Sequence, residues 1–167
     1  ERMLVAHDGW VRWVRTSPDG RLLASCGNDN LLKIWDTSNW ELVRVFKGHQ
    51  RYPYAVVFHP DGKRLASFDL MGVIKEWELA TGKVQWREKR QSTISSPLIA
   101  DGKFILMEKK GSDLVMLEAT PEAHREIAKT RVKAMWCPSP VISNGRLYLR
   151  RENHVVCFNL ALRQVVP

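Results

Sequence analysis

The sequence lacks three features that would each assign a class of protein at once: long apolar runs, an even set of cysteines and a leader segment. No segment approaches the roughly 18 to 20 consecutive apolar residues of a membrane helix, so no membrane partner is predicted. No charged-then-apolar leader follows Glu1, so we predict no signal peptide, and the compartment stays unassigned. The cysteines Cys26, Cys137 and Cys157 lack CxxC spacing, which argues against disulfides or a zinc site and predicts buried free thiols.

Motifs for catalysis and cofactor binding are missing as well. Neither a GxGxxG or GxxxxGK[ST] phosphate loop nor an HExxH zinc motif occurs. We therefore expect no catalytic residue, no cofactor and no metal. A Ser-His-Asp site assembled only in space stays open, and Asp8 beside His7 and Asp69 near His49 are its nearest candidates. Ordinary loop carboxylates are the interpretation that we favour for both.

The length and composition of the chain are ordinary. The 167 residues suffice for one domain, and 44% hydrophobic and 26% charged residues are typical of a soluble globular protein.

The chain is basic, but its charges show little pattern along the sequence. A net charge of +8 and a pI near 9.7 permit contact with polyanions. The basic residues are scattered, however, and the densest cluster, REKR at 87–90, contains a glutamate. Nucleic acid is therefore not an expected partner, and polyanion binding is kept as an alternative.

A repeat of 42 residues is the strongest signal in the chain. HPDG at 59–62 follows SPDG at 17–20, RLAS at 64–67 follows LLAS at 22–25, and KEWE at 75–78 follows KIWD at 33–36. His7 and His49 share the same spacing of 42 residues, and His59 stands at the turn position of Ser17, where we expect it to be exposed. Each unit consists of short apolar runs separated by Gly, Pro and Asn turns, which is typical of an all-β array.

The second half continues this rhythm in a different form. SSPLIADGKFIL at 95–106 and PSPVISNGRLYL at 138–149 each place a DG or NG turn between two apolar runs. The turn glycine therefore recurs at Gly20, Gly62, Gly102 and Gly145. Because a small sheet cannot bury both apolar faces alone, neighbouring units must pack face to face. We predict an all-β chain of four β-propeller blades, each with four antiparallel strands, with the ranges 7–48, 49–90, 91–133 and 134–167 after a closing strand at 1–6.

The first half, residues 1–90, resembles WD-repeat (Trp-Asp repeat) propeller blades. The matching marks are His7, SPDG, LLAS, Asp29 and Trp35-Asp36 in the first unit, and Gly48-His49, HPDG, RLAS and Trp77-Glu78 in the second. The resemblance implies a hydrogen-bonded network in each blade, formed by His7, Ser25, Asp29 and Trp35 and by His49, Ser67 and Trp77. Since Met71 stands 42 residues after Asp29 and Asp69 lies two residues early, we expect the second network to lack its carboxylate.

Residues 91–167 are similar to quinoprotein-like (PQQ-like) propeller repeats. The matching segments are SSPLIADGKFILMEKKGSDLVMLEA and WCPSPVISNGRLYLRRENHVVCFNL, in which a Pro precedes a short strand and a DG or NG turn follows. Nothing in these segments marks a quinone pocket, so no cofactor is implied. A chain of two repeat types is either a natural hybrid or an engineered chimera, and both interpretations remain open.

Ring closure has two alternatives. Residues 162–167 leave little for the last outer strand, and the apolar segment Arg2–Ala6 offers a spare one. Four blades are few for a propeller, so the chain either closes alone or forms an eight-bladed ring as a homodimer, with each N-terminal strand completing the partner's last blade. We rank the homodimer first.

Aromatic and arginine side chains gather where the chain enters the first strand of each blade. They are Trp10, Arg12, Tyr52, Tyr54 and Trp136. These residue types are enriched in binding hot spots, and they also fill blade interfaces. The sequence thus favours a non-catalytic scaffold or interaction module that binds itself or another protein. A propeller enzyme, or a polyanion-binding propeller with a site at the channel mouth, is the alternative.

Overall fold

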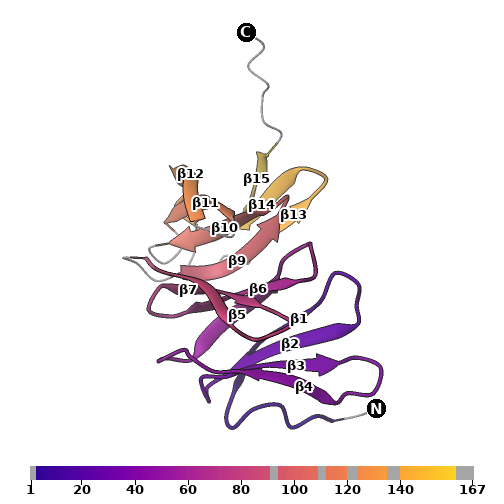
Figure 1. Cartoon of the computed structure of the whole chain (residues 1–167). Coiled ribbons are helices and arrows are strands. Elements are labelled where there is room, and N and C mark those ends of the chain that lie inside the picture. Colours follow the sequence, from indigo (N-terminus) through magenta and orange to yellow (C-terminus); the bar gives the residue numbers. More distant parts are fainter. Residues whose placement is uncertain (1–2, 91–93, 109–111, 120–123, 135–139, 161–167) are drawn as a thin grey trace.

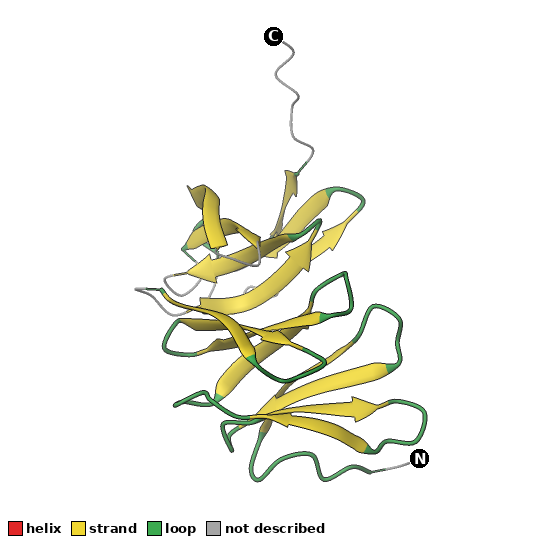
Figure 2. Cartoon of the chain, in the orientation of Figure 1, coloured by secondary structure: helices red, strands yellow, loops and turns green. Residues whose placement is uncertain are grey.

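The computed structural model describes residues 3–90, 94–108, 112–119, 124–134 and 140–160. Fifteen strands in four antiparallel sheets make up this part of the chain, which contains no helix (Figures 1 and 2). No described segment therefore offers a helix long and apolar enough to cross a bilayer. The predicted all-β, four-blade propeller architecture is confirmed.

Each sheet lies within one of the four blade ranges. The strands of the first two sheets are β1 (Val11–Thr16), β2 (Leu22–Gly27), β3 (Leu32–Asp36), β4 (Leu42–Phe46), β5 (Pro53–Phe58), β6 (Arg64–Asp69), β7 (Val73–Glu78) and β8 (Val84–Lys89). The other two contain β9 (Ile94–Ala100), β10 (Lys103–Glu108), β11 (Asp113–Ala119), β12 (His124–Arg131), β13 (Val141–Ser143), β14 (Arg146–Arg150) and β15 (Val155–Asn159). We call these sheets blades 1 to 4. Every blade is a simple up-and-down meander in chain order.

Turn chemistry separates the two halves of the chain. In blades 1 and 2 a five-residue loop joins the first two strands, and its Gly20 and Gly62 have φ angles of 73° and 66°. In blades 3 and 4 the same connection is a two-residue turn, Asp101-Gly102 or Asn144-Gly145, with positive φ at both positions. Positive φ at both central residues is typical of a type I′ turn, whose twist matches that of the flanking strands. The turn glycines predicted from the sequence thus occupy the turns.

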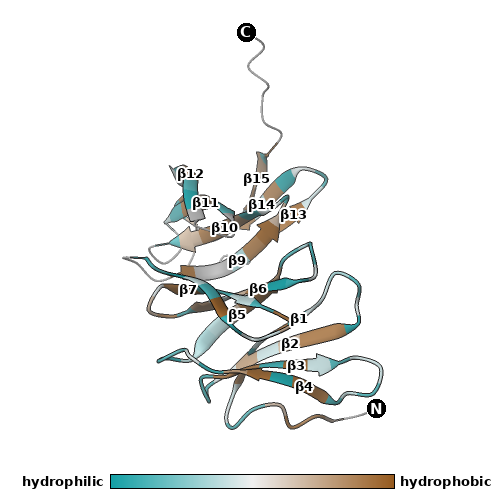
Figure 3. Cartoon of the chain, viewed as in Figure 1, coloured by the Kyte–Doolittle hydropathy of each residue, from teal (hydrophilic) through white to brown (hydrophobic). Residues whose placement is uncertain are grey.

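Apolar side chains from consecutive blades form three cores, one at each interface. The core between blades 1 and 2 includes Phe46 and Trp77, and that between blades 2 and 3 includes Phe68 and Phe104. Blades 3 and 4 pack through a core that includes Met107 and Leu149. In Figure 3 the apolar segments lie mainly in strands such as β2 and β9, whereas the turns are largely hydrophilic. Burial between blades therefore supplies the main stabilisation.

The row of blades has two open ends. Figure 1 places blade 1, near the N-terminus, and blade 4 at opposite ends of the row. Val14 in β1 is 53% exposed, whereas Val56, at the same position of blade 2, is fully buried against blade 1. At the other end Val141 and Val155 are 57% and 66% exposed. Each end blade thus has exposed apolar side chains on the face that is turned away from its neighbour.

The structure differs at both ends of the chain from the expected closing strand and the expected four-stranded last blade. Residues 3–6 form no strand, and blade 4 contains three strands among the residues described. The N-terminal segment instead runs beside blade 1, where Ala6 O accepts a hydrogen bond from Lys33 Nζ at 2.6 Å. Pairing of residues 3–6 with blade 4 is therefore absent within the described part of the chain, and pairing of the N-terminal segment with a second copy stays a prediction.

Two expectations about single residues were wrong. Cys157 is exposed on β15, while Cys26 is buried as expected, and burial raises the pKa of the Cys26 thiol to about 12. Cys137 lies outside the described residues. His59, which the sequence places at an exposed turn, is 3% exposed because its ring packs edge-on against Phe104 of blade 3, with centroids 5.6 Å apart.

Candidate functional site

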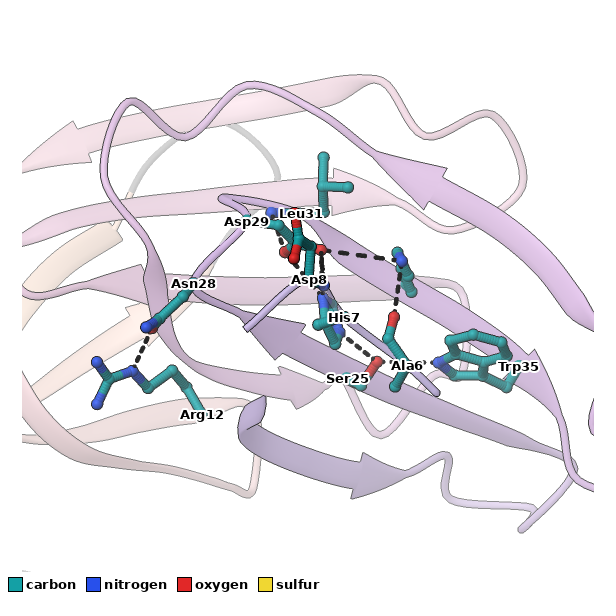
Figure 4. Close-up of polar contacts among 10 residues, drawn as sticks. Ala6, His7, Asp8, Arg12, Ser25, Asn28, Asp29, Leu31 and Trp35 are labelled. Atoms are coloured by element: carbon teal, nitrogen blue, oxygen red, sulfur yellow. Dashed lines mark hydrogen bonds and ion pairs between the residues drawn. The ribbon is translucent and has the colours of Figure 1, made fainter. Parts of the chain in front are cut away.

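A chain of hydrogen bonds crosses blade 1 from its entry loop to its third strand (Figure 4). His7, in the loop before β1, lies 2.7 Å from Ser25 Oγ through Nε2 and 2.8 Å from Asp29 Oδ1 through Nδ1. Trp35 Nε1 donates to the same Ser25 Oγ at 2.9 Å. The four residues of blade 1 that the sequence predicts as a network are thus brought together from the entry loop, two strands and the turn between those strands.

Each group in this chain has one role. A carboxylate only accepts, so His7 Nδ1 donates to Asp29, and in the uncharged tautomer Nε2 accepts from the Ser25 hydroxyl. Burial raises the pKa of Asp29, but hydrogen bonds from His7 and from the Leu31 backbone N–H outweigh burial and lower it overall. Asp29 therefore stays ionised and fixes both the histidine and the β2–β3 turn.

Blade 2 contains the same network with its carboxylate in a different place. His49 Nε2 lies 2.7 Å from Ser67 Oγ, which accepts from Trp77 Nε1 at 2.7 Å. Asp69 Oδ2 lies 3.4 Å from His49 Nδ1, so the expectation that this network lacks its carboxylate is wrong. Asp69 also accepts from the Met71 and Val73 backbone N–H groups through Oδ1. Burial, the largest single effect, raises the pKa of Asp69, but the hydrogen bonds together outweigh it and lower this pKa overall.

The two blades solve one steric problem in two ways. Gly27 and Asp69 occupy equivalent positions, at the end of β2 and of β6. A Cβ at Gly27 would lie 2.6 Å from His7 Cγ, so blade 1 requires glycine there and supplies its carboxylate from Asp29. Blade 2 has a side chain at this position, and that side chain is itself the carboxylate that binds His49. Both blades therefore keep a carboxylate beside the histidine, although Gly27 and Asp29 of blade 1 are replaced by Asp69 and Met71 in blade 2.

A lysine on the third strand of each blade also contributes to this arrangement, and sequence reasoning missed it. Lys33 Nζ donates to Ala6 O, and Lys75 Nζ donates to Gly48 O, both at 2.6 Å. Each bond ties the residue before the network histidine to the sheet. The 42-residue spacing of Lys33 and Lys75, within KIWD and KEWE, was the available signal.

We expect Gly27→Ala to lower the free energy of unfolding by roughly 1–3 kcal/mol, because the new methyl group overlaps the His7 ring. Urea unfolding followed by tryptophan fluorescence measures this loss. A double-mutant cycle with His7→Ala provides the control, since removal of the ring relieves most of the overlap. The same loss in both backgrounds would show that His7 does not impose glycine at this position.

The order Asp–His–Ser resembles that of a hydrolase triad, but the serines are inaccessible. Ser25 is 1% exposed and Ser67 is fully buried, and each Oγ already accepts the indole N–H of a tryptophan. A nucleophile must reach its substrate, and these hydroxyls face other side chains inside the blade. Asp8, the other candidate, contributes only its backbone N–H, to Asp29. Among the described residues no group of three or more His, Cys, Asp or Glu side chains could hold a metal ion.

Three of the five predicted binding residues form one cluster, in which Trp10 is exposed and Arg12 and Tyr52 are half-buried. The Arg12 guanidinium lies between two rings, 5.1 Å from the Trp10 centroid and 5.2 Å from the Tyr52 centroid. Arg12 Nε also donates to Asn28 Oδ1 at 2.6 Å. Trp10 is 71% exposed, about twice as much as Trp40, whose exposed fraction is 37%. We call Trp10, Arg12 and Tyr52 the aromatic–arginine cluster.

The other two predicted binding residues lie elsewhere. Tyr54 packs against Trp13, with ring centroids 6.3 Å apart, at the edge of the core between blades 2 and 3. Its position matches the inter-blade packing that the sequence also allowed. Trp136 lies outside the described residues.

Sequence reasoning missed two ionic clusters that join neighbouring strands and blades. Arg64 lies 2.8 Å from both Asp61 and the fully buried Glu76. Arg90, after β8, contacts Glu108 and Glu126 of blade 3, each at 2.6 Å. Burial raises the pKa of Glu108, but the bonds from Arg90 and Lys129 lower it overall. Neither cluster has a motif in the sequence, because its members meet only after the strands and blades pack.

Two segments of the chain match a known family model. The model described as "WD domain, G-beta repeat" matches residues 1–36 and 40–71. Protein groucho of Drosophila melanogaster is 34% identical over 86 residues, which is 52% of this chain and 11% of that protein. The Cross-pathway control WD-repeat protein 2 of Flammulina velutipes is 37% identical over 79 residues, 46% of this chain and 25% of that one. The matches therefore span only a minor part of either relative.

Solved structures share the fold at low sequence identity. A chain of the "Crystal Structure of Mitotic Checkpoint Complex" superposes with a TM-score of 0.77 at 20% identity, covering 89% of this chain and 48% of that one. The computationally designed Ika4 protein superposes with a TM-score of 0.73 at 17% identity, covering 95% and 96%. The family model thus identifies residues 1–36 and 40–71 as WD repeats, and the solved structures share the propeller fold of the chain.

Proposed function

We propose that the protein is a non-catalytic interaction module that binds another protein through the aromatic–arginine cluster. The exposed Trp10 carries this proposal, because it is 71% exposed and its indole lies beside the Arg12 guanidinium, which also contacts the Tyr52 ring. Tryptophan, tyrosine and arginine are the residues most enriched in binding hot spots. The relatives agree with this role: one structural neighbour is part of a structure named for a protein complex.

The cluster is held in place before any partner arrives. Arg12 is fixed by Asn28 and by the two rings, so little side-chain entropy is lost when a partner covers them. Inaccessible serines in both networks support the non-catalytic part of the proposal. The networks on this account are structural, and they hold the entry loops from which Trp10 and Tyr52 project.

A displayed peptide library tests the proposal although the partner is unidentified. We expect peptides selected on the wild-type chain to lose most binding to Trp10→Ala and Arg12→Ala, by tenfold or more in affinity, because hot-spot truncation costs about 2 kcal/mol or more. Biolayer interferometry measures the affinities.

Trp40→Ala is the matched control. Trp40 is 37% exposed and sits in the β3–β4 turn, at the opposite end of the same blade. Selected peptides should bind this variant as tightly as wild type. Peptides that bind Trp10→Ala and wild type equally would contradict the proposal.

We also propose that two copies of the chain complete an eight-bladed ring. The exposed apolar faces of blades 1 and 4 support this, because each resembles a face that is buried between blades elsewhere in the row. Val141, Tyr148 and Cys157 oppose one another in register, so they share the blade 4 face that is turned away from the blade 3–4 core. Blade 1 of one copy would cover blade 4 of the other, at two equivalent contacts.

We infer that blades 3 and 4 are quinoprotein-like repeats joined to the WD repeats. The two-residue turns at Asp101-Gly102 and Asn144-Gly145, in place of the five-residue loops of blades 1 and 2, support a second repeat type. The Arg90 ion pairs to Glu108 and Glu126 join the two halves across the blade 2–3 interface.

A further inference from the structure

A basic cleft lies at one end of blade 2, beside His49. It has a volume of about 330 Å³ and is lined by the β4–β5 connection, the β6–β7 turn and the end of β8. Besides His49, four cationic side chains line it: Arg51, Lys75, Arg87 and Lys89. Asp69 is the one carboxylate in the described lining. Its Oδ2 lies beside His49 Nδ1, and its Oδ1 accepts two backbone N–H groups.

Strand pairing forces three of these cations onto one face. Lys75 in β7 lies directly opposite Arg87 in β8, and Lys89 lies opposite Val73. Residues two apart on a strand share a face, so Lys75, Arg87 and Lys89 are neighbours. Like charges directly opposite each other destabilise a sheet, so this arrangement has a cost unless an anion is bound.

None of the four cations forms an ion pair in the described part of the chain. Arg51, Arg87 and Lys89 lie within 4 Å of no described carboxylate, and Lys75 donates to the neutral Gly48 O. Burial lowers the pKa of Lys75 and the nearby Arg87 lowers it further, while the charge of Asp69 raises it. Gly48 allows the approach, since a Cβ there would lie 3.2 Å from Lys75 Nζ.

The equivalent part of blade 1 lacks the cluster of opposed cations. Lys33, the counterpart of Lys75, lies 3.8 Å from Asp29, and Val45 rather than an arginine stands opposite it. Met71 replaces Asp29 in blade 2, and Arg51 stands 42 residues after Gly9. The blade fold therefore does not need the charge cluster, because an equivalent blade forms without it.

We propose that this cleft of blade 2 binds a phosphate monoester. A phosphate monoester carries a charge of about −1.5 to −2 at neutral pH and three acceptor oxygens, which suits several converging cations better than a single carboxylate does. Lysine supplies a point charge and arginine a planar fork for these oxygens. The cleft shares no lining residue with the aromatic–arginine cluster, although Arg51 directly precedes Tyr52, and it does not require ring closure.

Titration calorimetry at physiological ionic strength tests the site with three probes. They are inorganic phosphate, the peptide acetyl-Gly-phosphoserine-Gly-amide and its unphosphorylated counterpart. We expect saturable binding of the phosphorylated peptide and none of the unphosphorylated one. Tighter binding of the peptide than of inorganic phosphate assigns a phosphorylated protein as the source, and equal binding assigns a free phosphate compound. Absence of saturable binding by both phosphate probes would overturn the proposal.

Two variants each place a single blade 1 residue at the equivalent position of blade 2, and both positions are exposed. Arg87→Val removes a cation, and Met71→Asp places a carboxylate near Lys75 as Asp29 does near Lys33. We expect each to weaken phosphate binding about tenfold or more, with unfolding curves that still show a folded protein. Lys47→Ala, which removes the counterpart of Lys89 from blade 1, is the matched control and should leave binding unchanged. Equal affinity of wild type and both blade 2 variants would overturn the proposal.

Discussion

Trp77→Ala is expected to lower the free energy of unfolding by about 3–5 kcal/mol, the range typical of a buried aromatic truncated to alanine. Trp77 is 1% exposed and stacks on Phe46 of blade 1, with ring centroids 5.5 Å apart. Its indole N–H also donates to Ser67. The substitution therefore removes packing between blades and leaves a buried hydroxyl without its donor. Guanidinium unfolding, followed by circular dichroism, measures the change.

Trp10→Ala is the control for this loss. Both substitutions remove an indole, but Trp10 is 71% exposed, so its loss should change stability by less than about 1 kcal/mol. Trp77→Phe should fall between the two, since it retains most of the ring and loses the N–H donor. Equal losses for Trp10→Ala and Trp77→Ala would mean that the blade 1–2 core does not stabilise the chain.

The repeat predicted the fold because its landmarks have local physical causes. Gly20 and Gly62 are needed where the backbone takes positive φ, and Trp35 and Trp77 mark the third strand of their blades. These constraints act within one blade, so they recur at a nearly constant spacing. The members of both networks could be named for the same reason, although their distances could not.

Two of the errors concern contacts between residues that are distant in the sequence. His59 is buried by Phe104, a residue of the next blade, and nothing near His59 in the sequence indicates this. The second network is predicted to lack a carboxylate because Asp69 lies two residues before the position equivalent to Asp29. From the end of β6, however, the Asp69 carboxylate still lies 3.4 Å from His49 Nδ1. The carboxylate that binds the histidine cannot be found from the 42-residue spacing alone. It depends on the space beside the histidine ring, which in blade 1 admits only the glycine at position 27.

Val14→Arg is expected to abolish the proposed two-copy ring and halve the particle mass. Val14 is 53% exposed on the open face of blade 1, so an arginine is tolerated in the single chain. In the ring the same position would be buried against blade 4, as Val56 is against blade 1, and a buried unpaired charge is strongly unfavourable. Analytical ultracentrifugation of wild type and variant measures the shift.

Val43→Arg provides the matched control for this effect. Val43 is 52% exposed, but it lies on the outer strand β4, away from the first strand that faces the neighbouring blade. We expect this variant to sediment as wild type does. A ring that survives Val14→Arg, or that Val43→Arg disrupts equally, would show that the open face of blade 1 is not the contact.

The mass of the wild-type particle in solution tests the ring most directly. Size-exclusion chromatography coupled to light scattering should give twice the chain mass of 19.3 kDa, independent of dilution over the micromolar range. A single particle of 19.3 kDa at every concentration would contradict the two-copy ring and would leave the apolar faces of blades 1 and 4 exposed in the free chain.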